Sequence, residues 1–175
     1  MIACIFDTET TGLIDNQTVK LAVLPQVIEF ACIRVEWETM EEVSEYSTLV
    51  KPLGKITNPE RHRITDDMVA DAPSFSVVAG EIAIQLISDM VVAHNLSFDM
   101  EMIDVEFKRL GRSAAWPLIR VCTVEQTVFL FGRRMSLSEL YKNLTGNDHR
   151  EAHRALADVR CTLACLREMR RREWL

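Results

Sequence analysis

The sequence lacks the long apolar runs that a membrane-spanning helix needs, roughly 18 or more residues. The nearest stretch, residues 77–92, is interrupted by Glu81, Gln85 and Asp89 at helical spacing. No basic segment followed by a long apolar one opens the chain, so we expect no signal peptide. Repeats, low-complexity tracts and linkers are also absent. These absences predict one cytoplasmic domain, residues 1–175, with no membrane partner.

Cysteine pairs at metal-binding spacing are missing too. The five cysteines are an odd number scattered through apolar surroundings. Only Cys161 and Cys165 lie one helical turn apart, and no CxxC pair or second cluster joins them. We therefore expect packing thiols in a reducing compartment, and no zinc site.

Basic residues are fewer than acidic ones, and the net charge is −6 at pH 7. This balance argues against strong binding of nucleic acid through overall charge. It does not exclude an acidic metal site, because a cluster of carboxylates also lowers the net charge. The basic residues gather late in the chain, at Arg133, Arg134, Lys142, Arg160, Arg167, Arg170, Arg171 and Arg172. Such a run is typical of a solvated helix face, so we give it little weight as a binding patch.

Strand-like segments dominate the first third of the chain. Short runs rich in β-branched and aromatic residues, ended by proline, glycine or polar residues, predict strands. The predicted strands cover residues 2–6, 27–35, 43–50, 91–93 and 119–124. Only short polar breaks separate the first three, which predicts an antiparallel meander at the start of the sheet.

Helical patterns occupy most of the remainder. The predicted helices begin near Thr65 or Asp66, Ser74 or Ser76, Ser97, Thr123, Ser136 and Glu151. The second of them has its apolar positions at Val77, Ile82, Leu86 and Met90. Gly111 is the expected C-cap of the helix from Ser97 to Leu110. Strands first, then strands alternating with helices, predict an α/β fold with a mixed five-stranded sheet flanked by helices.

Two carboxylates follow the first strand, within DTETTG. Asp7 and Glu9 are two residues apart, and alternation along a strand points both to one side. Two anionic side chains in one place repel each other, and burying an isolated charge is costly. A hard cation such as Mg²⁺, which prefers carboxylate oxygens, resolves this conflict. Alone, the pair is equally well explained as two exposed acids at a strand end.

A third carboxylate, Asp99, comes after the strand VVAHN and at the start of a helix. An acid in a first helical turn often does no more than interact favourably with the helix dipole. His94, Asn95 and Phe98 stand beside it in HNLSFD, and this setting favours a site.

The last motif places His153 and Asp158 on the predicted final helix, within HRALADV. A separation of five residues spans about 1.4 turns, so both side chains can border one cleft. Helical histidines are more often packed or capping residues, but near a metal cluster a neutral imidazole suits proton removal from water. His149 lies four residues before His153, the spacing of a helical zinc pair. HREAH lacks the glutamate placement of HExxH, which disfavours zinc.

Together these segments resemble the DEDDh, or DnaQ-like, family of 3′–5′ exonucleases. That family includes the proofreading subunit of bacterial DNA polymerase III, ribonuclease T and oligoribonuclease. The matching motifs are FDTETTGL at 6–13, HNLSFD at 94–99 and HRALAD at 153–158, with HRITDDMVADAPSF at 62–75 also similar to proofreading members. The histidine of the third motif selects this branch over the tyrosine-bearing one. Each motif alone is weak, whereas the ordered set spans nearly the whole chain.

The resemblance implies a ribonuclease H-like fold and a hydrolase that releases nucleoside 5′-monophosphates from 3′ ends, preferably of single-stranded DNA. It implies that Asp7, Glu9, Asp99 and Asp158 bind two Mg²⁺ or Mn²⁺ ions. Asp7 would bridge the ions, Glu9 and Asp158 would complete one site, and Asp99 would act directly or through water. His153 would be the general base that activates the attacking water.

The resemblance also implies contacts to the terminal nucleotide beside the metal ligands. The candidates are Thr10, Thr11, Gly12, Leu13, His62, Ile64, His94 and Phe98. Gly12 permits close approach of the backbone, and Leu13 has an apolar side chain for packing on a base. For Leu13, Ile64 and Phe98, plain core packing is nearly as good an interpretation.

Several alternatives stay open. Ribonuclease T and oligoribonuclease act on RNA with the same carboxylates, although DTETTG and HRIT favour DNA. A degenerate module that only docks onto a DNA polymerase is less favoured, because all five expected catalytic residues are present. The chain ends at Leu175, without the extension by which the bacterial proofreading subunit holds its polymerase, which favours an independent enzyme. A homodimer and the role of the long loop Asp15–Leu24 are left open.

Overall fold

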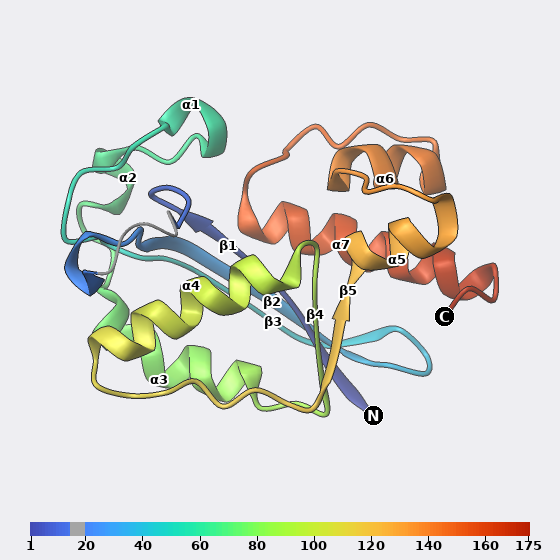
Figure 1. Ribbon diagram of the computed structural model, residues 1–175, viewed down its shortest axis with the longest axis horizontal. Coiled ribbons are helices and arrows are strands. Elements are labelled where there is room, and N and C mark those ends of the chain that lie inside the picture. Colours follow the sequence, from blue (N-terminus) through green and yellow to red (C-terminus); the bar gives the residue numbers. More distant parts are fainter. Residues whose placement is uncertain (15–19) are drawn as a thin grey trace.

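The centre of the molecule is one sheet of five strands in the order β3-β2-β1-β4-β5 (Figure 1). The computed structural model describes residues 1–14 and 20–175, so the first half of the long loop Asp15–Leu24 lies outside the described part. The strands are β1 (Ile2–Thr10), β2 (Val27–Glu36), β3 (Glu41–Leu49), β4 (Met90–Ala93) and β5 (Ile119–Cys122). The first three are antiparallel, β4 is parallel to β1, and β5 is parallel to β4. The predicted mixed sheet is confirmed.

Helices cover both faces of this sheet. They are α1 (Pro59–His62), α2 (Asp66–Val69), α3 (Phe75–Leu86), α4 (Leu96–Arg109), α5 (Thr123–Phe131), α6 (Leu137–Thr145) and α7 (Ala155–Arg171), with a 3₁₀ turn at Leu21–Val23. The helices α3 and α4 pack on one face, and α7 packs on the other (Figure 1). The helix α6 packs on α7 through a small core of its own.

Alternation along β1 connects the core to the site. Cys4 and Phe6 are buried with the apolar residues of α3 and α4, whereas Ala3 and Ile5 are buried with those of α7. The side-chain period of a strand is two residues, so Asp7 and Glu9 continue the row that faces α7. Thr8 continues the opposite row, toward α4. One face of the strand therefore supplies two carboxylates, and the other supplies the threonine that holds Asp99 of α4.

Several boundaries differ from the sequence prediction. The strand β1 does not end before Asp7, because its pairing with β2 continues to Thr10 opposite Val27. Met90 was expected on a helix but begins β4, and Val77 on α3 is 72% exposed rather than part of the apolar face. The one-turn helix α1 was not predicted.

Other signals were read correctly. The Ser136 side chain accepts a hydrogen bond from the Glu139 N–H and caps α6, as a serine before a helix with glutamate three residues later predicts. Gly111 follows α4 with a left-handed φ of 67°, which glycine adopts at little cost. All five cysteines are free, and four of them are buried. Among the described residues, no helix is long and apolar enough to cross a membrane.

Candidate active site

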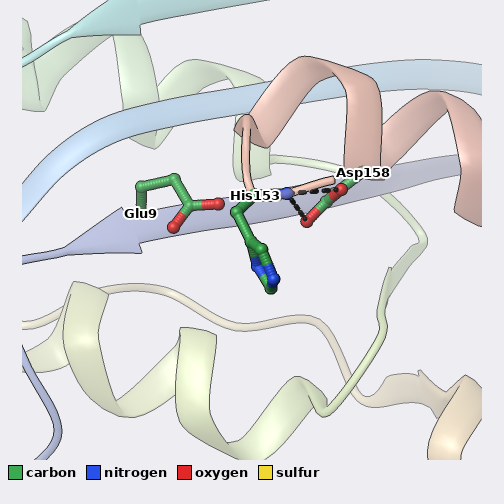
Figure 2. A group of neighbouring side chains, drawn as sticks. All are labelled: Glu9, His153 and Asp158. Atoms are coloured by element: carbon green, nitrogen blue, oxygen red, sulfur yellow. Dashed lines mark hydrogen bonds between the residues drawn. The ribbon is translucent and has the colours of Figure 1, made fainter. Parts of the chain in front are cut away.

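Four carboxylates from three parts of the chain border one cleft of about 380 Å³. Asp7 and Glu9 come from β1, Asp99 comes from the first turn of α4, and Asp158 comes from the first turn of α7. His153 lines the same cleft. Carboxylate oxygens of Glu9 and Asp158 and a ring nitrogen of His153 all lie within 4.8 Å of one another (Figure 2). The structure thus places together all five residues of the predicted catalytic set.

Asp99 is fixed to β1 near the end of that strand. Its Oδ1 accepts hydrogen bonds from the Thr8 N–H at 2.9 Å and from the Thr8 hydroxyl at 2.7 Å. Asn95, just before α4, has a left-handed φ of 73°, a conformation that asparagine tolerates better than most residues. This turn lets the chain pass from β4 directly into α4 and brings the helix N-terminus to the cleft.

His153 lies before α7 and not on it, so the prediction that it shares the final helix with Asp158 is wrong. It has a φ of 68° and is exposed, and its N–H donates to both oxygens of Asp158 at 3.3 Å. Arg154, at the N-cap, is extended. Figure 2 shows His153 between the Glu9 carboxylate and Asp158, whose two oxygens face the His153 backbone nitrogen. The Asp158 carboxylate holds the backbone of His153 outside the helix.

Glu29 explains where α7 begins. This buried residue of β2 accepts from the Ala155 N–H at 2.9 Å and from Nη2 and Nε of Arg154 at 2.7 and 3.1 Å. It also lies directly opposite Glu9 in the sheet. Glu29 was not predicted as a site residue, although a glutamate inside the apolar strand IEFACIRV is a signal for a buried polar contact.

His149 is hydrogen-bonded to Asp158. Its Nε2 forms a hydrogen bond with Asp158 Oδ1, and its side chain is 3% exposed. The ring of Tyr141 packs edge-on against it. This contact leaves Asp158 Oδ2 with the weaker backbone interaction from His153.

The acidic residues of the cleft hold protons more strongly than usual. Burial, followed by the charges of Asp158 and Glu29, raises the pKa of Glu9 to about 8. Burial raises the pKa of Asp99 to about 7, against the hydrogen bonds from Thr8. These raised pKa values mean that the ionised carboxylates are unfavourable in the cleft unless a positive charge neutralises them.

Burial and nearby charges also shift the pKa values of the remaining ionisable groups of the cleft. Burial and the nearby carboxylates raise the pKa of Asp7 well above its ordinary value, and burial raises that of Asp158 despite the contact with His149. Partial burial lowers the pKa of His153, with Arg61 contributing and Asp158 opposing. The oxygen donors of this set fit hard divalent cations such as Mg²⁺ or Mn²⁺, which would keep the carboxylates ionised.

Most of the predicted substrate contacts also line the cleft: Thr10, Gly12, Leu13, His62, His94 and Phe98. Two do not. Thr11 faces an adjoining hollow, where its hydroxyl accepts from the Gln26 N–H. Ile64 is fully buried against Ile28 and Val69, so core packing accounts for it.

Hydrogen bonds fix the rings of the two histidines among the predicted substrate contacts. Nδ1 of His62 accepts from the Ile64 N–H, and its Nε2 lies 3.1 Å from the carbonyl of Thr57. His94 contacts the Thr123 hydroxyl at 2.8 Å and the Met135 carbonyl at 3.1 Å, and burial lowers its pKa to about 4. Both rings are therefore held in place and form walls of the cleft.

Comparison with known proteins agrees with this geometry. The family model described as "Exonuclease" (RNase_T) matches residues 4–166. The DNA polymerase III PolC-type of Bacillus subtilis is 31% identical over 168 residues, which cover 94% of this chain and 11% of that protein. The PolC-type protein of Bacillus cereus is 32% identical over 160 residues, 90% of this chain and 10% of that protein. The chain thus spans about a tenth of the length of these relatives.

Solved structures show the same fold. Exonuclease X, solved with 5′ overhanging duplex DNA, is 29% identical with a TM-score of 0.69 and covers 99% of this chain and 94% of its own. The nuclease domain of 3′hExo, a DEDDh family member solved with rAMP, has a TM-score of 0.76 at 15% identity, with 99% and 94% coverage. The chain therefore belongs to the exonuclease family. Its fold is the ribonuclease H-like fold of these solved exonucleases, of which 3′hExo is a DEDDh family member.

The role of Glu29 can be tested by Glu29→Ala. We expect a loss of unfolding free energy on the order of 1–3 kcal/mol, because Arg154 and the Ala155 N–H lose their buried partner. Nuclease activity should fall with it, because His153 and Asp158 are placed by the start of α7. Glu45→Ala, which removes the exposed partner of Arg160, is the control and should change stability by about 1 kcal/mol or less. Equal effects of the two substitutions in urea unfolding would contradict this assignment.

The stability of the metal-free domain should depend on pH. Since the folded-state pKa values of Asp99 and Glu9 are raised to about 7 and about 8, their contribution is fully present below the ordinary carboxyl pKa near 4 and is lost as pH rises through 7 to 8. We expect thermal unfolding in a chelator to occur at lower temperature as pH rises over this range. Added Mg²⁺ should offset the decline, and the Glu9→Gln, Asp99→Asn double variant should flatten it. An unchanged pH dependence in that variant would refute the explanation.

Proposed function

We propose that this domain removes nucleotides one at a time from the 3′ end of single-stranded DNA by metal-dependent hydrolysis, with Asp7, Glu9, Asp99 and Asp158 as the metal ligands. The observation that carries this proposal is the meeting of four carboxylates with His153 in one cleft. The products are nucleoside 5′-monophosphates.

The donor set favours two Mg²⁺ or Mn²⁺ ions. Bound divalent cations would stabilise the negative charge that develops on the attacking and leaving oxygens of the phosphodiester. The chain's contribution is to hold the ligands in place. Thr8 fixes Asp99, and His149 occupies Oδ1 of Asp158 while Oδ2 keeps only weak contact with the protein.

His153 acts as the general base in this proposal. Its ring is exposed in the cleft beside Glu9 and Asp158, and its lowered pKa keeps the imidazole neutral near pH 7. A neutral ring can accept a proton from water as that water attacks phosphorus. The backbone contact between the His153 N–H and Asp158 couples the position of the base to that of a metal ligand.

The terminal nucleotide occupies the same cleft. Its volume of about 380 Å³ is within the range of small-ligand sites, roughly 300–1,000 Å³. Leu13 is 70% exposed at the rim, and an exposed apolar side chain can pack on a base. Thr10, Gly12 and Phe98 provide the neighbouring wall. An apolar contact of this kind suits an unpaired 3′ nucleotide.

The DNA assignment draws support from the relatives. The PolC-type relatives are DNA polymerases by name, and Exonuclease X was solved with DNA. We include in the proposal that the domain acts beside a DNA polymerase and removes mispaired 3′ nucleotides.

The reaction can be tested on 3′- and 5′-labelled single-stranded DNA and RNA oligonucleotides with Mg²⁺ or Mn²⁺ and an EDTA control. We expect metal-dependent shortening from the 3′ end, faster on DNA, and a loss of about 10³-fold or more in Asp7→Ala because the cluster loses a ligand. Faster shortening of RNA would reassign the substrate. No shortening of either polymer with either metal would overturn the proposed function.

The role of His153 as general base can be distinguished by experiment from the role of the metal ligands. His153→Ala should lower kcat by about 10²- to 10⁴-fold, the usual contribution of general base catalysis. Because the Asp158 contact uses the backbone of His153, Mn²⁺ affinity measured by calorimetry should change far less than in Asp158→Ala. A His153→Ala variant with wild-type kcat would exclude this role.

A further inference from the structure

The segment between β3 and α2 carries two exposed arginines, one lining the cleft and the other two residues further along. His62 and Ile64 are buried, whereas the alternate residues Arg61 and Arg63 are exposed. Arg61 lines the cleft itself. The two inward residues, which motif comparison had suggested as substrate contacts, act as anchors that turn their two neighbours outward.

This segment has a defined turn at each end of its short helix. The one-turn helix α1 is bounded by left-handed residues, Asn58 with a φ of 54° and Arg63 with a φ of 58°. The Arg63 N–H donates to the Pro59 carbonyl at 2.8 Å. Left-handed backbone is unfavourable for a long side chain, and glycine would adopt it at lower cost. The arginine at position 63 therefore costs free energy in a place where folding alone would favour glycine.

The segment is also joined to the first motif. The Thr57 hydroxyl donates to the Thr11 carbonyl, and His62 contacts the carbonyl of Thr57. Arg61 and Arg63 are thereby positioned relative to Leu13 and Gly12, the residues that border the terminal nucleotide. A strand with its 3′ end in the cleft can leave it along this wall.

The two side chains differ from the arginines near the C-terminus in having no partner among residues 1–14 and 20–175. The C-terminal run is neutralised by ion pairs, which join Arg160 to Glu45, Arg167 to Glu42, Arg170 to Glu38, and Arg171 and Arg172 to Glu168. In the described part of the chain, neither guanidinium of Arg61 and Arg63 forms a hydrogen bond or ion pair with another side chain. Their positive charge nevertheless reaches the site, since both lower the pKa of His153.

We propose that Arg61 and Arg63 form a phosphate-binding edge of the cleft, which holds the phosphodiester backbone of the substrate strand just upstream of its terminal nucleotide. This inference rests on the proposed function. An acidic cleft repels a polyanion, and guanidinium groups beside it offset that repulsion. Arginine suits the task because its planar guanidinium binds phosphate oxygens in pairs.

The test compares two substrates in the Arg61→Gln, Arg63→Gln double variant. One is a single-stranded 15-mer of deoxythymidylate. The other is the p-nitrophenyl ester of thymidine 5′-monophosphate, which contains one phosphodiester and no upstream phosphate. We expect kcat/KM for the 15-mer to fall about tenfold or more, mainly through KM, and to fall much less for the ester. The ratio of the two values is the readout.

Equilibrium binding gives a second readout that needs no turnover. Fluorescence anisotropy of a labelled 15-mer in EDTA should show weaker binding by the double variant and a shallower salt dependence. Two lost phosphate contacts reduce the slope of log K against log salt by about 1.4 for a single strand. The matched control is Lys108→Gln with Arg112→Gln, at the far end of α4. With α4 rising about 1.5 Å per residue from the cleft, these charges lie on the order of 20 Å away.

Loss of folding can be separated from loss of binding by Arg63→Gly. Glycine relieves the left-handed backbone, so Tm should not fall, whereas 15-mer binding should weaken. An unchanged substrate ratio and salt slope in the double variant would overturn the proposal, and so would equal losses in the double variant and the control. A wild-type domain inactive on both substrates would overturn the proposed function, while the binding measurement would still decide the role of the two arginines.

Discussion

Mutual repulsion among partly buried carboxylates is the constraint around which the rest of the molecule is organised. The negative charges of the four carboxylates repel one another, and burial makes their ionisation still less favourable. The four are Asp7, Glu9, Asp99 and Asp158. The surrounding fold must therefore force them together and leave a cation to stabilise them. Hydrogen bonds from Thr8 to Asp99 and from His149 to Asp158 show how individual oxygens are held against this repulsion.

The scaffold meets this demand by using both faces of one strand. Asp7 and Glu9 extend the row of β1 that packs on α7, and Thr8 extends the row that packs on α4. Glu29 on the neighbouring strand then fixes the start of α7. Each carboxylate is thus placed by backbone geometry, because a strand or a helix end is a stiffer support than a surface loop.

The parts of this arrangement that a sequence can predict are those governed by local pattern. Apolar runs located the strands, and Ser136 marked a helix start, because periodicity and capping act over a few residues. The three motifs identified the residues that meet at the cleft, through family resemblance. The left-handed φ at His153 and the contact of Glu29 with Arg154 depend on residues distant in sequence, so local pattern could not reveal them. Arg61 and Arg63 were overlooked for the same reason, since only packing shows that His62 and Ile64 point inward.

The site joins the first strand of the domain to its last helix, and this has a consequence for synthesis. A nascent chain that has emerged only as far as α6 carries Asp7, Glu9 and Asp99 but lacks His153 and Asp158. The ribosome must release most of α7 before that helix can dock on β1 and β2. An incomplete chain therefore lacks two of the five residues of the predicted catalytic set, and the order of translation leaves the cleft unfinished until the core around β1 has closed.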